Sequence, residues 1–424
     1  MLALAGLASL LLVAGALAMR PRAGDDRVPG VRPTGGDPAE GRPYRRGVWL
    51  LLDAGEQRHA CDNPVRGRYR YIVVQWSVTN DPDCSLKRIR AANPDAKVLA
   101  YQNLGAMIAG PHTDGRPSTC VTQEEAAAND AAEPAASWHL HDPAGNALAF
   151  RDEWGFLQPA NLARGSYQER CLRRLEKVRE DGYDGVLADD VNAYPGHNLG
   201  EGTGAPIAEY PTDAAYGDAV VGALRHIGPA ALPLGLLLIP NVGADVTDPA
   251  QRDRALAIAG ASSGLFREFW TRWDGPGDGQ GGADWEAGAA LARAVERLGK
   301  PFLANTYAGP GPGGPAADQR YAVASFWLVW DGRQDSAWGY DAPGRADAGF
   351  SPAWGPDLGE PVDPERVRVG AGWLRRYDAG VAVVNPSPST AQRFELGARW
   401  PLPDGTVAST VLLPPRTGMV LVDR

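Results

Sequence analysis

Two adjacent carboxylates, Asp189 and Asp190, end the stretch DGYDGVLADDV at residues 181–191. A DGYDG turn precedes them and leads into a short apolar run of the kind that forms a buried strand. Adjacent like charges repel, and burial of either carboxylate disfavours its charged form. Stability alone does not favour this arrangement, so the pair points to contact with solvent, to ligand binding or to catalysis.

Further carboxylates follow other apolar runs of the chain. They are Asp53, Glu268 and Asp331. Hydrolysis of a glycosidic bond needs two carboxyl groups, one protonated to assist the leaving oxygen and one ionised to attack the sugar. Structural alternatives remain open for each: Asp53 could pair with an arginine, Asp190 could cap a helix, and Glu268 could pair with Arg267 or Arg272.

The composition disfavours several other classes of function. The formal net charge of -9 and the lack of a Lys/Arg cluster argue against a nucleic-acid partner. Only six histidines are present and they form no H-E-x-x-H set, so we expect no metal site and no cofactor. No G-x-G-x-x-G follows the first apolar run, which argues against a doubly wound nucleotide-binding sheet.

The elements that would position these residues alternate between apolar runs and amphipathic helices. Continuously apolar runs are typical of parallel strands buried on both faces, and eight of them with interleaved helices predict a (β/α)8 TIM barrel, an α/β fold. The strand candidates are 46–53, 69–77, 97–103, 184–191, 233–243, 264–270, 301–307 and 322–330.

Barrel enzymes place their active sites at the carboxyl ends of the strands, so the residues that finish each run are the candidates for substrate contact. The chain has 13 tryptophans against 8 phenylalanines, and flat aromatic faces suit the faces of sugar rings. The predicted sugar-binding residues are Asp53, Trp76, Asn103, Asp190, Tyr194, Asn241, Trp270, Tyr307 and Asp331.

The chain divides into five expected segments. The apolar run of residues 1–18 ends in a small-x-small pattern and is expected to be a signal peptide or, because Arg20 and Arg22 follow it, an anchor. A disordered linker is expected over 19–45, the barrel over 46–335, a connector over 336–364, and a small antiparallel β-sandwich domain over 365–424. Export to the cell envelope or medium is the implied location.

Four cysteines, an even number in a chain expected to be exported, indicate two disulfides. Of the three possible pairings, we expect Cys61 with Cys84 and Cys120 with Cys171.

The stretches GVWLLLD, REDGYDGVLADDV and LLPPRTGMVLV resemble the hypothetical glycosyl hydrolases of the α-galactosidase-like barrel superfamily, with endo-α-1,4-polygalactosaminidases as more distant relatives. In such families the Asp that ends strand 4 is the nucleophile and a carboxylate that ends strand 6 is the acid/base. The resemblance therefore implies Asp189 as nucleophile and Glu268 as general acid/base. Asp190 stands where the polygalactosaminidase-like sequences tend to have Asn, which leaves open which of the two aspartates attacks.

The leading hypothesis is an exported, monomeric glycoside hydrolase acting on an oligo- or polysaccharide with retention of configuration. Two alternatives stay open: a catalytically inactive barrel that binds glycan at the cell surface, and an envelope protein tethered by an uncleaved N-terminal helix. The side of the strands that carries Glu268 separates the first two, because a side chain directed into the helix layer would leave Asp189 without a catalytic partner.

Overall fold

The computed structural model describes residues 45–52, 54–62, 67–109, 116–150, 155–199, 206–272, 280–307, 315–341 and 357–422. The expected N-terminal segment 1–18, nearly all of the expected linker, and Asp53 lie outside these residues. No helix within the described ranges is long and apolar enough to cross a membrane.

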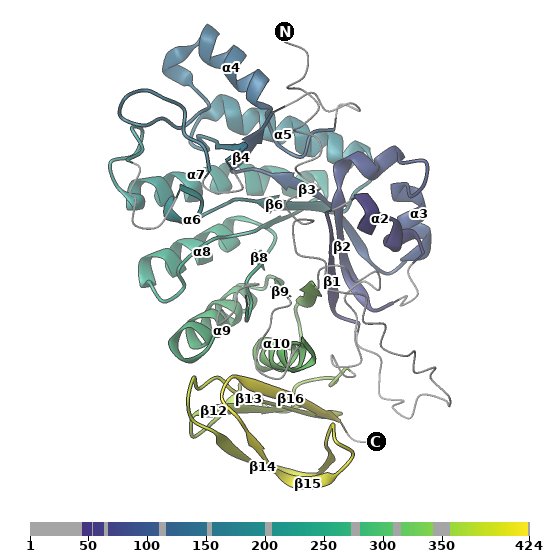
Figure 1. Ribbon diagram of the computed structural model, residues 1–424. Coiled ribbons are helices and arrows are strands. Elements are labelled where there is room, and N and C mark those ends of the chain that lie inside the picture. The colour runs from purple at the N-terminus through teal and green to yellow at the C-terminus, as the bar shows by residue number, and fades with distance from the viewer. Residues whose placement is uncertain are drawn as a thin grey trace, which may run out of the picture.

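Eight parallel strands form a nearly closed barrel (Figure 1). The sheet order β7-β6-β3-β2-β1-β10-β9-β8 follows the chain around the barrel, and a parallel bridge between Asn241 and Phe266 joins its two edges. This confirms the predicted TIM barrel. The strands are β1 (Gly47–Leu51), β2 (Tyr69–Gln75), β3 (Lys97–Asn103), β6 (Gly185–Asp189), β7 (Leu237–Pro240), β8 (Leu265–Arg267), β9 (Phe302–Tyr307) and β10 (Ala337–Asp341).

Helices surround the strands. They are α2 (Ala54–Cys61), α3 (Leu86–Ala92), α5 (Gly165–Glu180), α7 (Asp213–Ala231), α8 (Pro249–Ala261), α9 (Gly282–Arg297) and α10 (Pro315–Val329), with a short α6 (Gly196–Leu199). Two apolar cores result from the alternation of side chains along the strands. One fills the barrel interior and includes Tyr71, Leu187 and Phe266, and the other lies between the strands and the helices.

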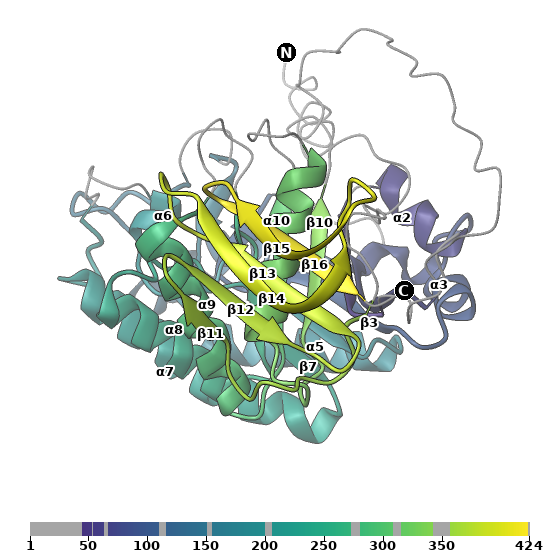
Figure 2. The same ribbon diagram turned by 90° about the horizontal axis from the view of Figure 1, so that it is seen from below.

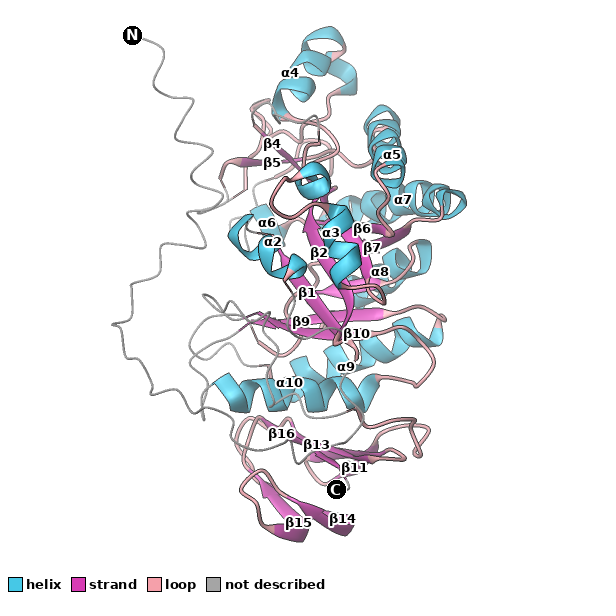
Figure 3. Ribbon diagram, turned by 90° about the vertical axis from the view of Figure 1, so that its right-hand side faces the viewer, coloured by secondary structure: helices cyan, strands magenta, loops and turns pink. Residues whose placement is uncertain are grey.

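The last predicted strand, 322–330, is wrong, because this stretch belongs to helix α10. The residues from Ala322 to the end of α10 are all buried, since the barrel packs on one side of the helix and the C-terminal sheet on the other (Figures 2 and 3). A helix buried all round loses its amphipathic period and resembles a buried strand in sequence. The eighth strand is β10, so the barrel continues past the boundary expected at residue 335.

The long connection between β3 and α5 forms a small insertion above the barrel. It holds the hairpin of β4 (Ala106–Ile108) and β5 (Leu157–Pro159) and the helix α4 (Gln123–Ala132), whose Thr122 and Glu125 form a capping box. The Cys120–Cys171 disulfide ties the insertion to α5, and the Cys61–Cys84 disulfide joins the end of α2 to the segment before α3. Both expected pairings are confirmed.

The C-terminal domain is a small β-sandwich. A four-stranded sheet, β11 (Val367–Val369), β12 (Gly372–Arg376), β13 (Gly380–Asn385) and β16 (Thr417–Val422), faces the hairpin β14 (Gln392–Pro401) and β15 (Val407–Leu413). Its central strand β13 is buried throughout: Val381 and Val383 pack in the core shared with the hairpin, whereas Ala382 and Val384 join the core that contains α10. The domain thus lies against the helix layer (Figure 1).

Candidate active site

Five side chains at the carboxyl ends of five neighbouring barrel strands form one continuous chain of hydrogen bonds. Tyr101 lies two residues before the end of β3, Asp189 ends β6, Asn241 follows β7, Glu268 follows β8, and Tyr307 ends β9. The bonds run in the same order as the strands, from Tyr101 to Asp189, then through Asn241 to Glu268 and Tyr307.

The alternation of side chains along a strand explains why these residues meet. Leu99, Leu187, Ile239, Phe266 and Leu303 all belong to the core inside the barrel. A side chain two residues farther along points to the same face, which directs Tyr101, Asp189, Asn241 and Glu268 toward the barrel axis, and Tyr307 lies four residues after Leu303. The apolar layer beneath thereby fixes the direction of the polar layer above it.

Asp189 accepts three hydrogen bonds. The Tyr101 hydroxyl donates to its Oδ2 at 2.5 Å, while the amide Nδ2 of Asn241 and the backbone N–H of Asp190 donate to its Oδ1, both at 2.9 Å. Three donors stabilise an ionised carboxylate and hold it in one orientation. This environment suits a nucleophile.

Asn241 bridges the two candidate catalytic carboxylates. Its Nδ2 donates to Asp189 Oδ1 at 2.9 Å and to Glu268 Oε2 at 2.7 Å, so these two oxygens are no farther apart than the sum of both lengths, 5.6 Å. The two N–H bonds of an amide diverge by roughly 120°, which places the oxygens about 5 Å apart. Glu268 therefore points into the barrel, toward Asp189, and not into the helix layer.

Asp190 takes a different direction from Asp189. Its φ of 54° lies in the left-handed region, which Asp tolerates better than most residues. Its carboxylate accepts a hydrogen bond from Asn103, whose own Oδ1 accepts the backbone N–H of Ala106. The turn needs Gly105, because a Cβ there would lie 1.9 Å from the Asp190 carbonyl oxygen. Asp190 is thus bound to the end of β3, while Asp189 is linked to Glu268.

The site is open to solvent in part. Asp189, Asp190, Asn241, Glu268 and Tyr307 are all partly exposed. Tyr101 is half-buried, and burial together with the nearby carboxylates of Asp189, Asp190 and Glu268 raises its pKa well above the usual value, so its hydroxyl remains a donor.

The two arginines considered as partners of Glu268 are engaged elsewhere. Arg267 lies in the outer layer, where its Nε donates to the Phe269 carbonyl oxygen and burial lowers its pKa to about 10. Arg272 pairs with Asp318 at 3.6 Å. Glu268 instead accepts hydrogen bonds from Asn241 and Tyr307.

Two tryptophans predicted to stack on sugar are buried in the outer core. Trp76 is 1% exposed and its indole N–H donates to Asp181, while Trp270 is 2% exposed and donates to the Ala322 carbonyl oxygen. Neither offers a face to solvent, so the structure does not support a stacking role. Both rings fill the space between strands and helices instead.

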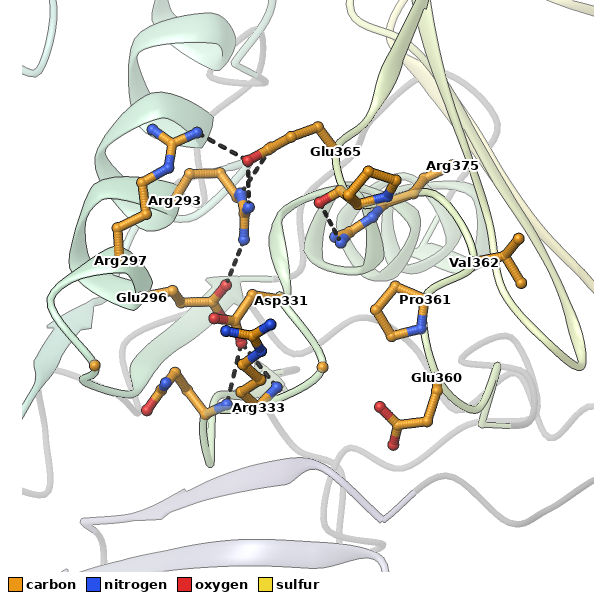
Figure 4. A pocket seen from close by; sticks show the side chains of 14 residues that line it. Arg293, Glu296, Arg297, Asp331, Arg333, Glu360, Pro361, Val362, Glu365 and Arg375 are labelled. Carbon is orange, nitrogen blue, oxygen red and sulfur yellow. Dashed lines mark hydrogen bonds and ion pairs between the residues drawn. The ribbon is translucent and has the colours of Figure 1, made fainter.

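Asp331 lies at the opposite end of the barrel from the candidate site, because the strand expected to precede it is helix α10. Its Oδ1 accepts the backbone N–H groups of Arg333 and Gln334, which makes it a turn residue. It also lines a pocket of about 670 Å³ between the barrel and the C-terminal domain, beside Glu296 and Arg333 (Figure 4). The predicted sugar contact at Asp331 is therefore wrong.

The remaining predicted residues divide by their contacts. Asn103 is 3% exposed and holds Asp190, and Asn241 holds the two carboxylates, so both orient acidic groups. Tyr194 lies partly exposed beyond β6, and its stacking role stays a prediction. Tyr101 lies near the end of a predicted strand but was given no role in the site, although its even spacing from the buried Leu99 places it on the interior face of β3.

Among the described residues, no group of three or more His, Cys, Asp or Glu side chains is arranged to hold a metal ion. The chemistry available at this cluster is that of carboxyl groups, amides and phenols.

Comparison with known families adds to this geometry. The model of hypothetical glycosyl hydrolase family 15 matches residues 90–381, more than half of the chain. The chain belongs to this family. This confirms the resemblance inferred from sequence and makes the protein a glycoside hydrolase by family. The two disulfides also fit an extracytoplasmic location for this family member.

Similar solved structures include the glycoside hydrolase domain of PelA from Pseudomonas aeruginosa, at 15% identity and a TM-score of 0.43, covering 73% of this chain and 97% of that one. Aspergillus fumigatus Ega3 in complex with galactosamine has 13% identity and a TM-score of 0.37, covering 71% and 93%. Eubacterium rectale Amy13B has 10% identity and a TM-score of 0.49, covering 91% and 97%. Comparison with curated proteins finds no significant match.

Proposed function

We propose that this protein hydrolyses glycosidic bonds of an oligo- or polysaccharide outside the cytoplasm, with Asp189 as nucleophile and Glu268 as general acid/base. The observation that carries the proposal is the shared Asn241 amide, which limits the separation of the two facing oxygens to 5.6 Å. Retaining glycosidases hold their carboxyl groups about 5 to 5.5 Å apart, and inverting ones hold them about 6.5 to 9.5 Å apart. The spacing favours retention.

The reaction would proceed in two steps. An oxygen of Asp189 attacks the anomeric carbon as the glycosidic bond breaks, and the carboxyl proton of Glu268 passes to the leaving oxygen. The Glu268 carboxylate then takes a proton from water, whose oxygen attacks the same carbon and releases Asp189.

The electrostatics of the pair suit these roles. Two ionised carboxylates with facing oxygens no more than 5.6 Å apart repel by at least about 3 kcal/mol at an effective dielectric constant of 20. This repulsion favours a state in which one of them carries a proton. Three hydrogen-bond donors favour the ionised form of Asp189, so we assign the proton to Glu268.

Asp189 fits the role of nucleophile better than Asp190. Asp190 is held by Asn103 at the β3 end, whereas Asp189 shares a hydrogen-bond donor with Glu268. We therefore place Asp190 and the partly exposed Tyr194 among the residues that line the substrate site.

The test is hydrolysis of a panel of amino-sugar and neutral polysaccharides by purified wild type, Asp189→Asn and Glu268→Gln. Each substitution exchanges a carboxyl group for an amide of the same size, which can neither attack the sugar nor donate an acidic proton. We therefore expect turnover to fall by at least 1,000-fold, on the order of the effect of general acid–base catalysis. Asp331→Asn is the matched control at the other end of the barrel and should keep wild-type activity. Hydrolysis retained by Asp189→Asn on a substrate that the wild type cleaves would remove Asp189 from the role.

A further inference from the structure

Two phenols flank the carboxylate pair on its outer sides. Tyr101 lies on β3, the strand paired with β6, and its hydroxyl donates to Asp189 Oδ2 at 2.5 Å. Tyr307 lies on β9, the strand paired with β8, and its hydroxyl donates to Glu268 Oε1 at 2.5 Å. Each carboxylate therefore has the central Asn241 amide on one oxygen and a phenol on the other.

We propose that Tyr101 and Tyr307 are positioning residues with opposite tasks, Tyr101 keeping Asp189 ionised and oriented for attack, and Tyr307 setting the pH at which Glu268 gives up its proton. This inference rests on the proposed hydrolase function and assigns the control of protonation within the same site.

The Tyr101 ring is fixed by the barrel interior. It packs partly buried against the core that contains Leu99 and Leu187, and β3 pairs with β6 in register so that Asn103 stands opposite Asp189. Burial and the three neighbouring carboxylates keep the phenol protonated, as its raised pKa indicates. The hydroxyl is therefore a permanent donor aimed at one oxygen of Asp189.

Tyr307 is fixed by the sheet and by an aromatic neighbour. It pairs with Asp341 at the end of β9, its backbone N–H lies 3.4 Å from the Arg272 carbonyl oxygen, and its ring centroid lies 6.2 Å from that of Phe269. The stacking role predicted for Tyr307 would use the ring face. In the structure the Tyr307 hydroxyl donates to Oε1 of Glu268, and the Asn241 amide donates to Oε2 of the same carboxylate.

Several titratable groups face the pair. Asp189 is surrounded by Tyr101 from β3, by Asp190, which directly follows β6, and by Glu268 across Asn241. Glu268 is faced by Tyr307 from β9 and by Asp189. Its negative charge also contributes to the raised pKa of Tyr101. The phenols are the members of this set that donate hydrogen bonds directly to the catalytic carboxylates.

The two phenols should act on opposite limbs of the pH profile. In a two-carboxylate hydrolase the acidic limb of kcat/KM reports ionisation of the nucleophile, and the alkaline limb reports loss of the proton of the acid. A hydrogen bond donated to a carboxylate favours its charged form. Removal of Tyr101 OH should therefore move the acidic limb to higher pH, and removal of Tyr307 OH should move the alkaline limb to higher pH.

The experiment compares kcat, KM and the pH profile of wild type, Tyr101→Phe and Tyr307→Phe. The rings keep their volume, so folding should persist. We expect each variant to displace its own limb by about one pH unit, in keeping with the effect of a single hydrogen-bond donor on a carboxylate, and kcat to fall while KM stays within about twofold. Tyr71→Phe is the matched control, because Tyr71 lies fully buried in the same barrel interior and its hydroxyl has no hydrogen-bond partner among the described residues. It should move neither limb.

A measurement without substrate separates this inference from the proposed function. The carboxyl ¹³C signals of Asp189 and Glu268, assigned by their loss in Asp189→Asn and Glu268→Gln, should titrate about one pH unit higher in the Tyr101→Phe and Tyr307→Phe variants respectively. Unmoved titrations and unmoved limbs in an active enzyme would overturn the inference and leave the hydrolase proposal standing. Shifted titrations in a protein whose Asp189→Asn variant still hydrolyses glycans would keep the positioning roles and overturn the assignment of the nucleophile.

Discussion

Replacement of Asn241 by alanine tests the bridge between the two carboxylates. The change removes one amide that donates to Asp189 at 2.9 Å and to Glu268 at 2.7 Å. A hydrogen bond to a charged group contributes about 1.5 to 3 kcal/mol, and water can replace part of it because both carboxylates are partly exposed. If the orientation supplied by one such bond is lost from the transition state, kcat/KM should fall by about 10- to 150-fold.

The assay is steady-state hydrolysis of the substrate found in the polysaccharide panel, with urea unfolding of the same preparations. We expect the free energy of unfolding to change by less than about 1 kcal/mol, since solvent reaches the site. Asn192→Ala is the matched control, because Asn192 is a buried neighbour whose Oδ1 accepts the backbone N–H of Gly243 and which is not part of the five-residue chain. A kcat/KM within threefold of wild type in Asn241→Ala would refute the reasoning that the shared amide organises the pair.

Three further predictions concern stability and are measured by urea unfolding. Glu296 is buried and accepts hydrogen bonds from Ser336 and Arg293, and burial raises its pKa from 4.5 to about 8. Between about pH 4.5 and pH 8 the folded state keeps a proton that the unfolded state loses, so the free energy of unfolding falls as the pH rises through this range. Glu296→Gln should remove up to about 1.4 kcal/mol per pH unit of that decline. The same pH dependence in wild type and Glu296→Gln would contradict this. Asp190→Ala should cost about 1 to 2 kcal/mol, because alanine tolerates a φ of 54° poorly and loses the Asn103 bond, whereas Asp190→Asn should cost less; equal stability of the two variants would count against strain at this turn. The double variant Cys120→Ser and Cys171→Ser opens a cross-link of sequence separation 51 and should lose about 4 kcal/mol by chain entropy; a loss below 1 kcal/mol would show that the insertion is held by its other contacts.

The sequence was most informative where the physical signal was local. Strands such as β3 and β6 are short apolar runs bounded by turns, and the polar residues at their ends marked the face that carries the candidate site. The pairing of Cys61 with Cys84 and Cys120 with Cys171 was also recovered.

Prediction failed where burial came from a distant part of the chain. Helix α10 is covered on its outer side by the C-terminal sheet, so its apolar residues do not show the helical period and were assigned to a strand. That error also misplaced Asp331, which lies at the base of the barrel. Trp76 and Trp270 do lie near the carboxyl ends of strands, as predicted, but their rings pack in the outer core between strands and helices. A position near the end of a strand does not show to which side of the sheet the ring points.

Contacts within the site were beyond the reach of sequence alone. The position of Asn241 after β7 suggested that its side chain binds the sugar, whereas its amide donates hydrogen bonds to Asp189 and Glu268. Tyr307 was predicted as a stacking face and Tyr101 was given no role. Only the spatial order of the strands shows that their hydroxyls donate to different carboxylates. These roles depend on which strands are neighbours around a closed barrel.

The most direct test of a cooperating Asp189 and Glu268 pair is the anomeric configuration of the first product, followed by ¹H NMR within minutes of adding enzyme to its best polysaccharide substrate. Facing oxygens no more than 5.6 Å apart predict that the sugar first appears with the configuration of the bond that was cleaved. First appearance of the opposite anomer would require room for a water between the two carboxyl groups and would contradict the account.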